Sequence, residues 1–156
     1  MVRCYNFDVV FAEIPGETTL ALNISGCPNR CPGCHSPHLQ GDTGRVLDEA
    51  ELRALLDRYG RSVTCLCFMG GDAAPHEIAR LAECVRRLQP GLRTGWYSGR
   101  DELPEGLRIR SFDYVKLGRW IADRGPLSAP TTNQRLYRVH ADGTTEDITD
   151  RFRRRP

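Results

Sequence analysis

The sequence predicts an α/β fold, a partial (β/α) barrel of about six strands with an N-terminal hairpin. Strand patterns and helix patterns alternate along the middle of the chain, and this order favours parallel strands joined by right-handed crossovers. The chain has 156 residues, whereas a complete eight-stranded barrel takes about 250. About six strands with few long insertions therefore leave a barrel with an open side.

The first two predicted strands form the hairpin. Residues 5–11 and 19–25 have strand patterns, and the second run alternates leucine and isoleucine with smaller or polar residues. Pro15 and Gly16 lie between the two runs and are the residues that a type II turn favours. We therefore expect a strand pair at the beginning of the chain.

Two amphipathic helices are predicted after the hairpin. Asp48 with Glu51 three positions later resembles a capping box, and a run of leucines on one face ends at Gly60. Pro75 suits the first turn of the second helix, and apolar residues recur at helical spacing over 78–88. Each helix precedes a predicted strand.

Four more strand candidates share short, largely apolar runs bounded by turn residues. They are residues 63–68, 92–97, 112–117 and 135–139. Ligands of parallel sheets and barrels collect at the carboxyl ends of the strands. We therefore expect the loops at the ends of these strands to meet on one rim.

Three cysteines follow the second strand in a CxxxCxxC spacing, namely Cys27, Cys31 and Cys34. Cluster irons are held by Cys thiolates, and four cysteines saturate a four-iron cluster for electron transfer. Three ligands leave one iron free, which suits a reduced cluster that holds S-adenosylmethionine and passes an electron to it. The spacing therefore predicts a 4Fe-4S cluster with S-adenosylmethionine as cosubstrate.

A structural zinc site is the alternative for the same cysteines. Three thiolates with His35 or His38 would give four tetrahedral ligands. Zinc sites usually present CxxC pairs well separated in sequence, and no second pair follows at the usual distance. A disulfide framework is also disfavoured, because disulfides are rare inside cells and residues 1–8 have no signal-peptide core.

The other four cysteines do not form a second motif. Cys65 and Cys67 lie in a largely apolar strand pattern and are expected to be inert core thiols. Cys4 and Cys84 have no partner at ligand spacing.

Composition predicts one soluble, cytoplasmic domain. The 22 basic residues nearly balance the 20 acidic residues, so neither a nucleic acid nor a membrane surface is indicated as a partner. No apolar run approaches the length of a membrane span. The domain is placed at residues 1–150, and residues 151–156, with four arginines, are interpreted as a basic, solvated tail.

Residues near the ends of other strands complete the predicted site. Gly70 and Gly71 would let a ligand approach the backbone, and Asp72 would add an acceptor for an ammonium group. Ser98 and Lys116 end the next two strands and would join the rim. On their own, a glycine pair is more often a tight turn, and a lysine at a strand end is usually solvated.

Three segments, residues 23–37, 70–72 and 132–135, resemble the radical S-adenosylmethionine activating proteins of anaerobic ribonucleotide reductases. The Cys-Pro-Gly-Cys-His ending of the cysteine motif and the Asn-Gln-Arg segment point to this branch. The resemblance implies a partial barrel of the radical SAM type, with the three cysteines on a 4Fe-4S cluster. It also implies that six residues contact S-adenosylmethionine: Gly33, Cys34, His35, Gly70, Gly71 and Asp72.

The implied activity is reductive cleavage of S-adenosylmethionine to methionine and a 5′-deoxyadenosyl radical. This radical would abstract a hydrogen from a glycine of a partner glycyl radical enzyme, the anaerobic ribonucleoside-triphosphate reductase, with flavodoxin or ferredoxin as electron donor. Gly33 stands where pyruvate formate-lyase activases usually carry an aromatic residue, which favours the reductase branch. Ala73-Ala74 is a departure, because it replaces the Pro-Leu common in the family, and it bears on the close contacts that this loop makes.

Two other classes of function stay open. One is a radical enzyme that acts on a small molecule, similar to the carboxy-deazaguanine synthases in compactness. The other is a non-catalytic module in which the cysteines hold a metal.

Overall fold

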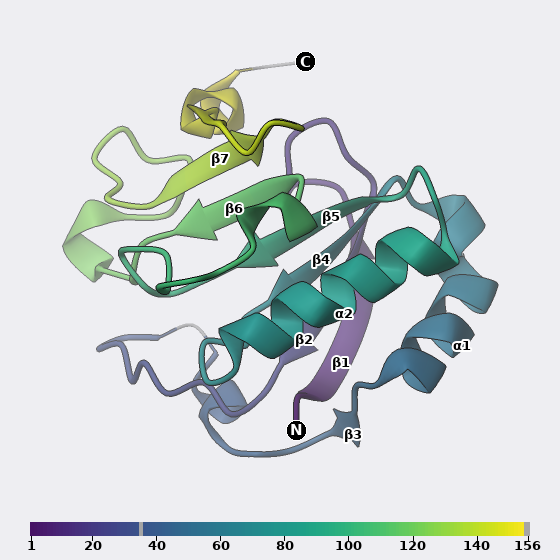
Figure 1. Cartoon of the computed structure of the whole chain (residues 1–156). Coiled ribbons are helices and arrows are strands. Elements are labelled where there is room, and N and C mark those ends of the chain that lie inside the picture. Colours follow the sequence, from purple (N-terminus) through teal and green to yellow (C-terminus); the bar gives the residue numbers. More distant parts are fainter. Residues whose placement is uncertain (35, 155–156) are drawn as a thin grey trace.

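The computed structural model describes residues 1–34 and 36–154, and it shows one mixed sheet with two α-helices on one face (Figure 1). The strand order in the sheet is β3-β1-β2-β4-β5-β6-β7-β8. The strands are β1 (Arg3–Val10), β2 (Thr19–Ile24), β3 (Arg45–Val46), β4 (Cys65–Met69), β5 (Arg93–Tyr97), β6 (Tyr114–Leu117), β7 (Arg135–Val139) and β8 (Thr145–Asp147). Strands β2, β4, β5 and β6 are parallel neighbours, and the other pairings are antiparallel.

All six strands predicted from the sequence are present, and two short strands are added. Strand β3 has two residues and β8 has three, which is too short for a hydrophobic pattern to indicate them. Both end strands of the sheet pair on one side only. Closure into a partial barrel stays a prediction, while Figure 1 shows a strongly twisted sheet whose strand direction turns from β1 to β7.

The predicted hairpin is confirmed. Strands β1 and β2 pair antiparallel, and the Glu17 amide donates to the Ile14 carbonyl oxygen at 3.1 Å across the turn. Gly16 has a φ of +85°, which is the left-handed conformation that the third position of a type II turn requires.

The two predicted helices are α1 (Glu49–Tyr59) and α2 (Pro75–Leu88). An Asp48 side-chain oxygen accepts from the Glu51 amide at 2.9 Å, so Asp48 caps α1. Short 3₁₀ turns occur at Pro37–Gln40, Gly60–Ser62, Ile109–Ser111, Ala122–Arg124 and Thr149–Arg153. No helix in the described part of the chain has the length and apolar character needed to cross a bilayer.

Alternate residues of β4 face the two sides of the sheet. Leu66 and Phe68 belong to the large core cluster under the helices, whereas Cys65 and Cys67 belong to a second, smaller cluster on the opposite face. Both cysteines are fully buried, and burial raises the pKa of both thiols. The prediction that they are core residues is confirmed.

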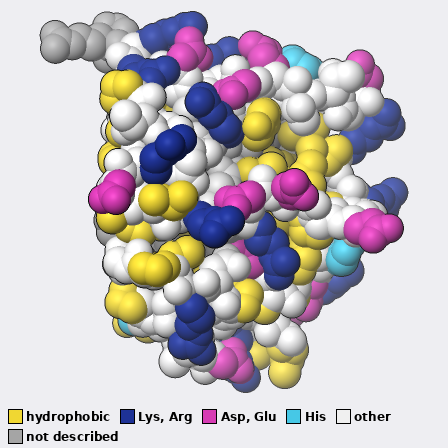
Figure 2. Space-filling view, turned by 90° about the vertical axis from the view of Figure 1, so that its left-hand side faces the viewer, with side chains coloured by type: hydrophobic (Ala, Val, Ile, Leu, Met, Phe, Trp, Pro, Cys, Tyr) yellow, Lys and Arg dark blue, Asp and Glu magenta, His cyan; other side chains and the backbone are white. Residues whose placement is uncertain are grey.

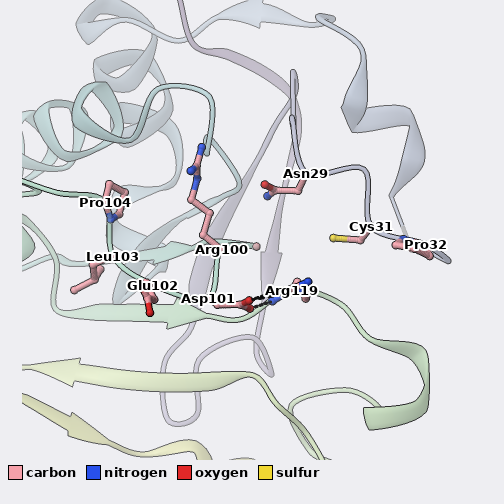
Figure 3. A pocket seen from close by; sticks show the side chains of 10 residues that line it. Asn29, Cys31, Pro32, Arg100, Asp101, Glu102, Leu103, Pro104 and Arg119 are labelled. Carbon is pink, nitrogen blue, oxygen red and sulfur yellow. Dashed lines mark hydrogen bonds and ion pairs between the residues drawn. The ribbon is translucent and has the colours of Figure 1, made fainter.

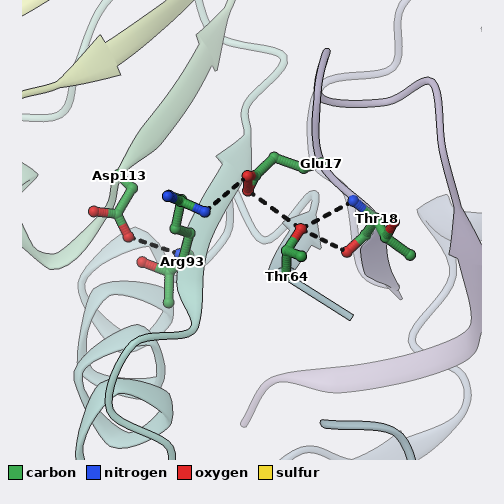
Figure 4. Close-up of polar contacts among 6 residues, drawn as sticks. Glu17, Thr18, Thr64, Arg93 and Asp113 are labelled. Carbon is green, nitrogen blue, oxygen red and sulfur yellow. Dashed lines mark hydrogen bonds and ion pairs between the residues drawn. The ribbon is translucent and has the colours of Figure 1, made fainter. Parts of the chain in front are cut away.

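The connection between β1 and β2 covers the opposite face of the sheet. Ile14 is fully buried there, and a Cβ at Gly95 would come within 2.8 Å of the Ile14 Cδ1 atom. Glu17 accepts from Arg93 at 3.0 Å and also lies beside Thr64 (Figure 4). This segment therefore fixes the β1–β2 pair to the beginnings of β4 and β5.

The domain boundary at residue 150 stays a prediction, and the chain continues past it in a 3₁₀ turn. Residues 149–153 form a 3₁₀ turn, and the Thr149 hydroxyl accepts from the Leu136 amide at 2.8 Å. Phe152 packs against the second core cluster. Residues 151–153, half of the predicted tail, therefore adjoin the domain, because Phe152 between the arginines packs against its core.

Candidate metal centre at the strand ends

The cysteine-bearing loop leaves the end of β2 and is anchored at its base. The Gly26 amide donates to the Gly41 carbonyl oxygen, and the Cys27 amide donates to the Leu39 carbonyl oxygen, both at 2.9 Å. Between these anchors, the Cys34 amide donates to the Cys31 carbonyl oxygen at 3.1 Å, which makes a turn inside the motif. The two ends of the loop are therefore hydrogen-bonded to each other beside the end of β2, and the cysteine motif starts from this base.

The three thiols of this loop are free and only partly buried. The pKa of the Cys27 thiol is raised by burial first, and then by the negative charges of Asp72, Cys31 and Cys34. The Ser36 amide donates to the Cys34 sulfur at 3.4 Å. A cationic iron–sulfur core would relieve the repulsion between these thiolates, so the donor set fits such a group.

The thiols are not closed around a single metal ion. Among the described residues, no three His, Cys, Asp or Glu side chains are arranged to hold one. His38 instead lies against the Tyr5 ring, with 5.1 Å between ring centroids, and His35 lies outside the described residues. A four-iron cluster differs from a single ion in that each of the three loop cysteines would hold a different iron.

The ends of the parallel strands meet beside this loop, as expected. The Ser98 hydroxyl after β5 donates to Asp72 Oδ1 after β4 at 2.6 Å, and the Gly99 amide donates to Asp72 Oδ2 at 2.8 Å. The Ser98 amide donates to the Lys116 carbonyl oxygen in β6 at 2.9 Å. The predicted common rim is confirmed.

Gly70 and Gly71 are required by the backbone of this rim. Their φ angles are +109° and +96°, and a Cβ at Gly71 would lie 2.5 Å from a side-chain atom of Ile78. The Gly70 carbonyl oxygen accepts from the Trp96 indole at 2.8 Å. The turn geometry alone accounts for both glycines, and their contact with a ligand stays a prediction.

Asp72 is 1% exposed, and its carboxylate already has three donors. Besides Ser98 and Gly99, the side-chain amide of Asn29 donates to Asp72 Oδ2 at 2.5 Å. Arg100 adds a hydrogen bond of 3.0 Å to the Asp72 main-chain oxygen. A carboxylate offers about four lone-pair positions, so little of this one is left for an ammonium group.

Lys116 is buried rather than solvated, with 7% of its surface exposed. Its ammonium group donates to the Gln134 side-chain oxygen at 2.9 Å and to the Gly118 carbonyl oxygen at 3.0 Å. Burial lowers the pKa of Lys116 to about 8. Both acceptors are neutral, so the positive charge has no directly bonded counter-ion.

Asn29 and Gln134 are the site residues that sequence reasoning did not assign a role. Both lie inside the segments that carry the family resemblance. The available signal for Asn29 was its polar side chain in a loop rich in Cys, Pro and Gly. No sequence pattern indicated that Gln134 would contact Lys116.

A hollow of about 620 Å³ opens beside Cys31, whose sulfur points into it (Figure 3). Its wall is formed by the cysteine loop, the segment after β5 and Arg119 after β6. Arg119 is paired with Asp101 at 2.5 Å on this wall. Figure 2 shows the side of the molecule toward which β6 runs, and basic, acidic and apolar side chains are interspersed on it.

Comparison with known families identifies the cysteine-bearing region. Residues 14–100 match the model of the 4Fe-4S single cluster domain. The chain belongs to this family. The matched part of the 4Fe-4S single cluster domain runs from the turn before β2 to the segment after β5, so it contains the three loop cysteines and the turn at 70–72. The chain is therefore an iron–sulfur protein with a 4Fe-4S domain.

The family match also bears on which cysteines are candidate ligands. Six cysteines lie within residues 14–100. Cys65, Cys67 and Cys84 are buried, at 0%, 0% and 3% exposure. The other three, in the loop, are partly exposed, which makes them the accessible candidates of this 4Fe-4S domain.

The sequence of one other protein is also similar to this chain, but over only a small part of that protein's length. The chain is 28% identical over 109 residues to Dicer-like protein 2-2 of Aspergillus niger. This match covers 67% of the chain and 8% of the fungal protein. The chain thus spans only a small part of the length of that relative. No solved structure matches the chain.

Proposed function

We propose that this chain is a radical S-adenosylmethionine enzyme that activates a glycyl radical enzyme. The observation that carries the proposal is the set of three accessible thiols in a 4Fe-4S domain, on one loop beside the rim of parallel strand ends. Three thiolates leave one iron of a four-iron cluster open. When bound, the reduced cluster supplies the electron that cleaves S-adenosylmethionine to methionine and a 5′-deoxyadenosyl radical.

The residues of the rim would bind and orient S-adenosylmethionine. The ammonium group of Lys116, whose hydrogen-bond acceptors are both neutral, would attract the methionyl carboxylate. Gly33 and Cys34 of the cysteine loop, with Gly70 and Gly71 of the strand ends, would line the rest of the ligand. Asp72 and Ser98, which are 1% and 0% exposed, would support this rim from behind. His35 belongs to the same proposed set through the family resemblance.

The proposed partner is an anaerobic ribonucleoside-triphosphate reductase, with flavodoxin or ferredoxin as reductant. The resemblance of residues 23–37, 70–72 and 132–135 supports this choice of partner. The hollow beside Cys31 is open to the surface, so a glycine-bearing protein loop could reach the site. Docking of that loop would then exclude water from the radical.

A small-molecule substrate is the second candidate. The hollow of about 620 Å³ lies within the usual range of small-ligand sites, roughly 300–1,000 Å³. The discriminating observation is whether cleavage of S-adenosylmethionine leaves a radical on the partner reductase.

The test is anaerobic reconstitution with iron and sulfide, followed by a strong reductant and S-adenosylmethionine, with quantification of 5′-deoxyadenosine. We expect 5′-deoxyadenosine from the wild type and none from Cys31→Ala. Cys65→Ala is the matched control, because it removes a fully buried thiol of the core and should cost about 1–2 kcal/mol of stability while cleavage continues.

Adding the reductase separates the two candidate substrates. A glycyl radical signal in its electron paramagnetic resonance spectrum would support the activase. Failure of the reduced, cluster-bearing protein to cleave S-adenosylmethionine with or without the reductase would overturn the radical proposal.

A further inference from the structure

A hydrogen bond joins the cysteine loop to the strand ends across a long sequence separation. Asn29 lies between Cys27 and Cys31, and its side-chain amide donates to Asp72 Oδ2, 43 residues further along the chain. Asp72 is held in turn by Ser98 and Gly99 after β5. The main-chain contacts at residues 26–27 hold the base of the loop, whereas Asn29 holds its cysteine-bearing part.

Gly99 supplies an independent observation at the same place. A Cβ at Gly99 would lie 2.7 Å from Asn29 Nδ2 and 3.4 Å from Asp72 Oδ2. Its φ is outside the left-handed range that favours glycine, so the backbone does not explain the residue. The absence of a side chain instead leaves the space through which the Asn29 amide reaches Asp72.

We infer that Asn29, Asp72 and Gly99 form a latch that positions the Cys27–Cys34 loop for cluster binding. Asp72 then acts here as a positioning residue through Asn29. The inference rests on the proposed ligation of a cluster by the three loop cysteines. Its physical basis is that three sulfurs must each reach an iron of the same cluster, and a loop already fixed in its middle loses less conformational entropy when the cluster binds.

The sharpest test is Gly99→Ala, which inserts a methyl group between Asn29 and Asp72 without changing either. The displaced atom is the end of a side chain, so we expect the variant to fold, with a free energy of unfolding lowered by the contribution of the lost hydrogen bond. Iron release from the reconstituted protein to a chelator should become about tenfold faster, since a hydrogen bond to a charged group is lost. Asn29→Leu should have the same effect.

The double variant Asn29→Leu with Gly99→Ala should release iron no faster than either single variant, because both remove the same contact. Gly41→Ala is the matched control. A Cβ there meets only Thr43 Cγ2, at 3.9 Å, so iron release should be unchanged. Iron release at the wild-type rate in both single variants would overturn the latch, as would additive effects in the double variant.

A second readout does not depend on the cluster. In the metal-free protein, we expect Cys31 to react faster with a thiol reagent in Gly99→Ala than in the wild type or Gly41→Ala, measured by mass spectrometry of the labelled peptide. Failure of the wild type to take up iron and sulfide would contradict the proposed function, whereas the labelling rates would still show whether Asn29 holds the loop. Equal labelling rates in all three proteins would contradict the latch alone.

Discussion

At the scale of single residues, Lys116 shows how strongly packing changes a side chain. The sequence places it at the end of a strand, where a lysine is usually solvated, but the structure buries it over the Tyr97 ring, with the ammonium nitrogen 5.6 Å from the ring centroid. Its two hydrogen-bond acceptors are neutral. The protein therefore retains a buried positive charge beside the candidate site at a cost in stability.

This cost predicts a specific dependence on pH. Burial lowers the pKa of Lys116 from 10.5 to about 8. Between these values the unfolded chain holds the proton and the folded chain does not, so the free energy of unfolding rises with pH across this window. Below pH 8 both the folded and the unfolded chain hold the proton, so the folded protein bears the full free-energy cost of burying the charged Lys116.

We therefore expect the stability of the wild type relative to Lys116→Met to increase by about 3 kcal/mol between pH 8 and 10.5. Urea unfolding of both proteins at several pH values measures this difference, because other titrating groups contribute equally to both. A difference that stays constant with pH would contradict the burial of a charged Lys116.

At the scale of elements, helix α1 is set by signals within its own sequence. Its N-cap, Asp48, binds the Glu51 amide as the capping-box pattern predicted. Its leucines face the core, with Leu52, Leu55 and Leu56 all buried. Local chemistry and packing agree in this element, which is why its limits were predicted to within a residue.

Asp48→Ala tests the contribution of the cap. It leaves one amide of the first turn without its side-chain acceptor, and we expect a loss of about 1 kcal/mol in the free energy of unfolding. Asp57→Ala is the control, since it removes an exposed carboxylate near the other end of the same helix. Urea unfolding measures both, and an equal loss in the two variants would argue against capping.

At the scale of the whole molecule, the segment between β1 and β2 joins distant parts of the sheet. Ile14 fills the space that Gly95 leaves open above Cys67. Arg93 at the beginning of β5 pairs with Glu17 at the other end of the same segment. One face of the sheet is thus covered by a connection rather than by helices.

Gly95→Ala should destabilise the protein by about 1–3 kcal/mol, because its Cβ would overpack against Ile14 Cδ1 at 2.8 Å. Ile14→Val removes that atom, so the double variant should lose less stability than the two single changes add up to. The measurement is urea unfolding of all four proteins. Strict additivity would show that the two residues do not pack against each other.

The fold was predictable where its signals are local. Six strands and two helices follow from hydrophobic periodicity and turn residues, with limits within about two residues of those observed, as for residues 135–139. Strands β3 and β8 were missed because two or three residues carry no period. The packing of Phe152 was missed because its arginine-rich surroundings resemble a solvated tail.

The sequence by itself determined the three-cysteine motif, the order of strands and helices, and the meeting of the strand ends on one rim. Only the tertiary structure decided that Asp72 binds Asn29, Ser98 and Gly99, and that Lys116 is buried against Gln134. The physical reason is distance along the chain. Cysteine spacing and periodicity are read within a few residues, whereas burial and these hydrogen bonds arise only when segments 18 to 43 residues apart pack together.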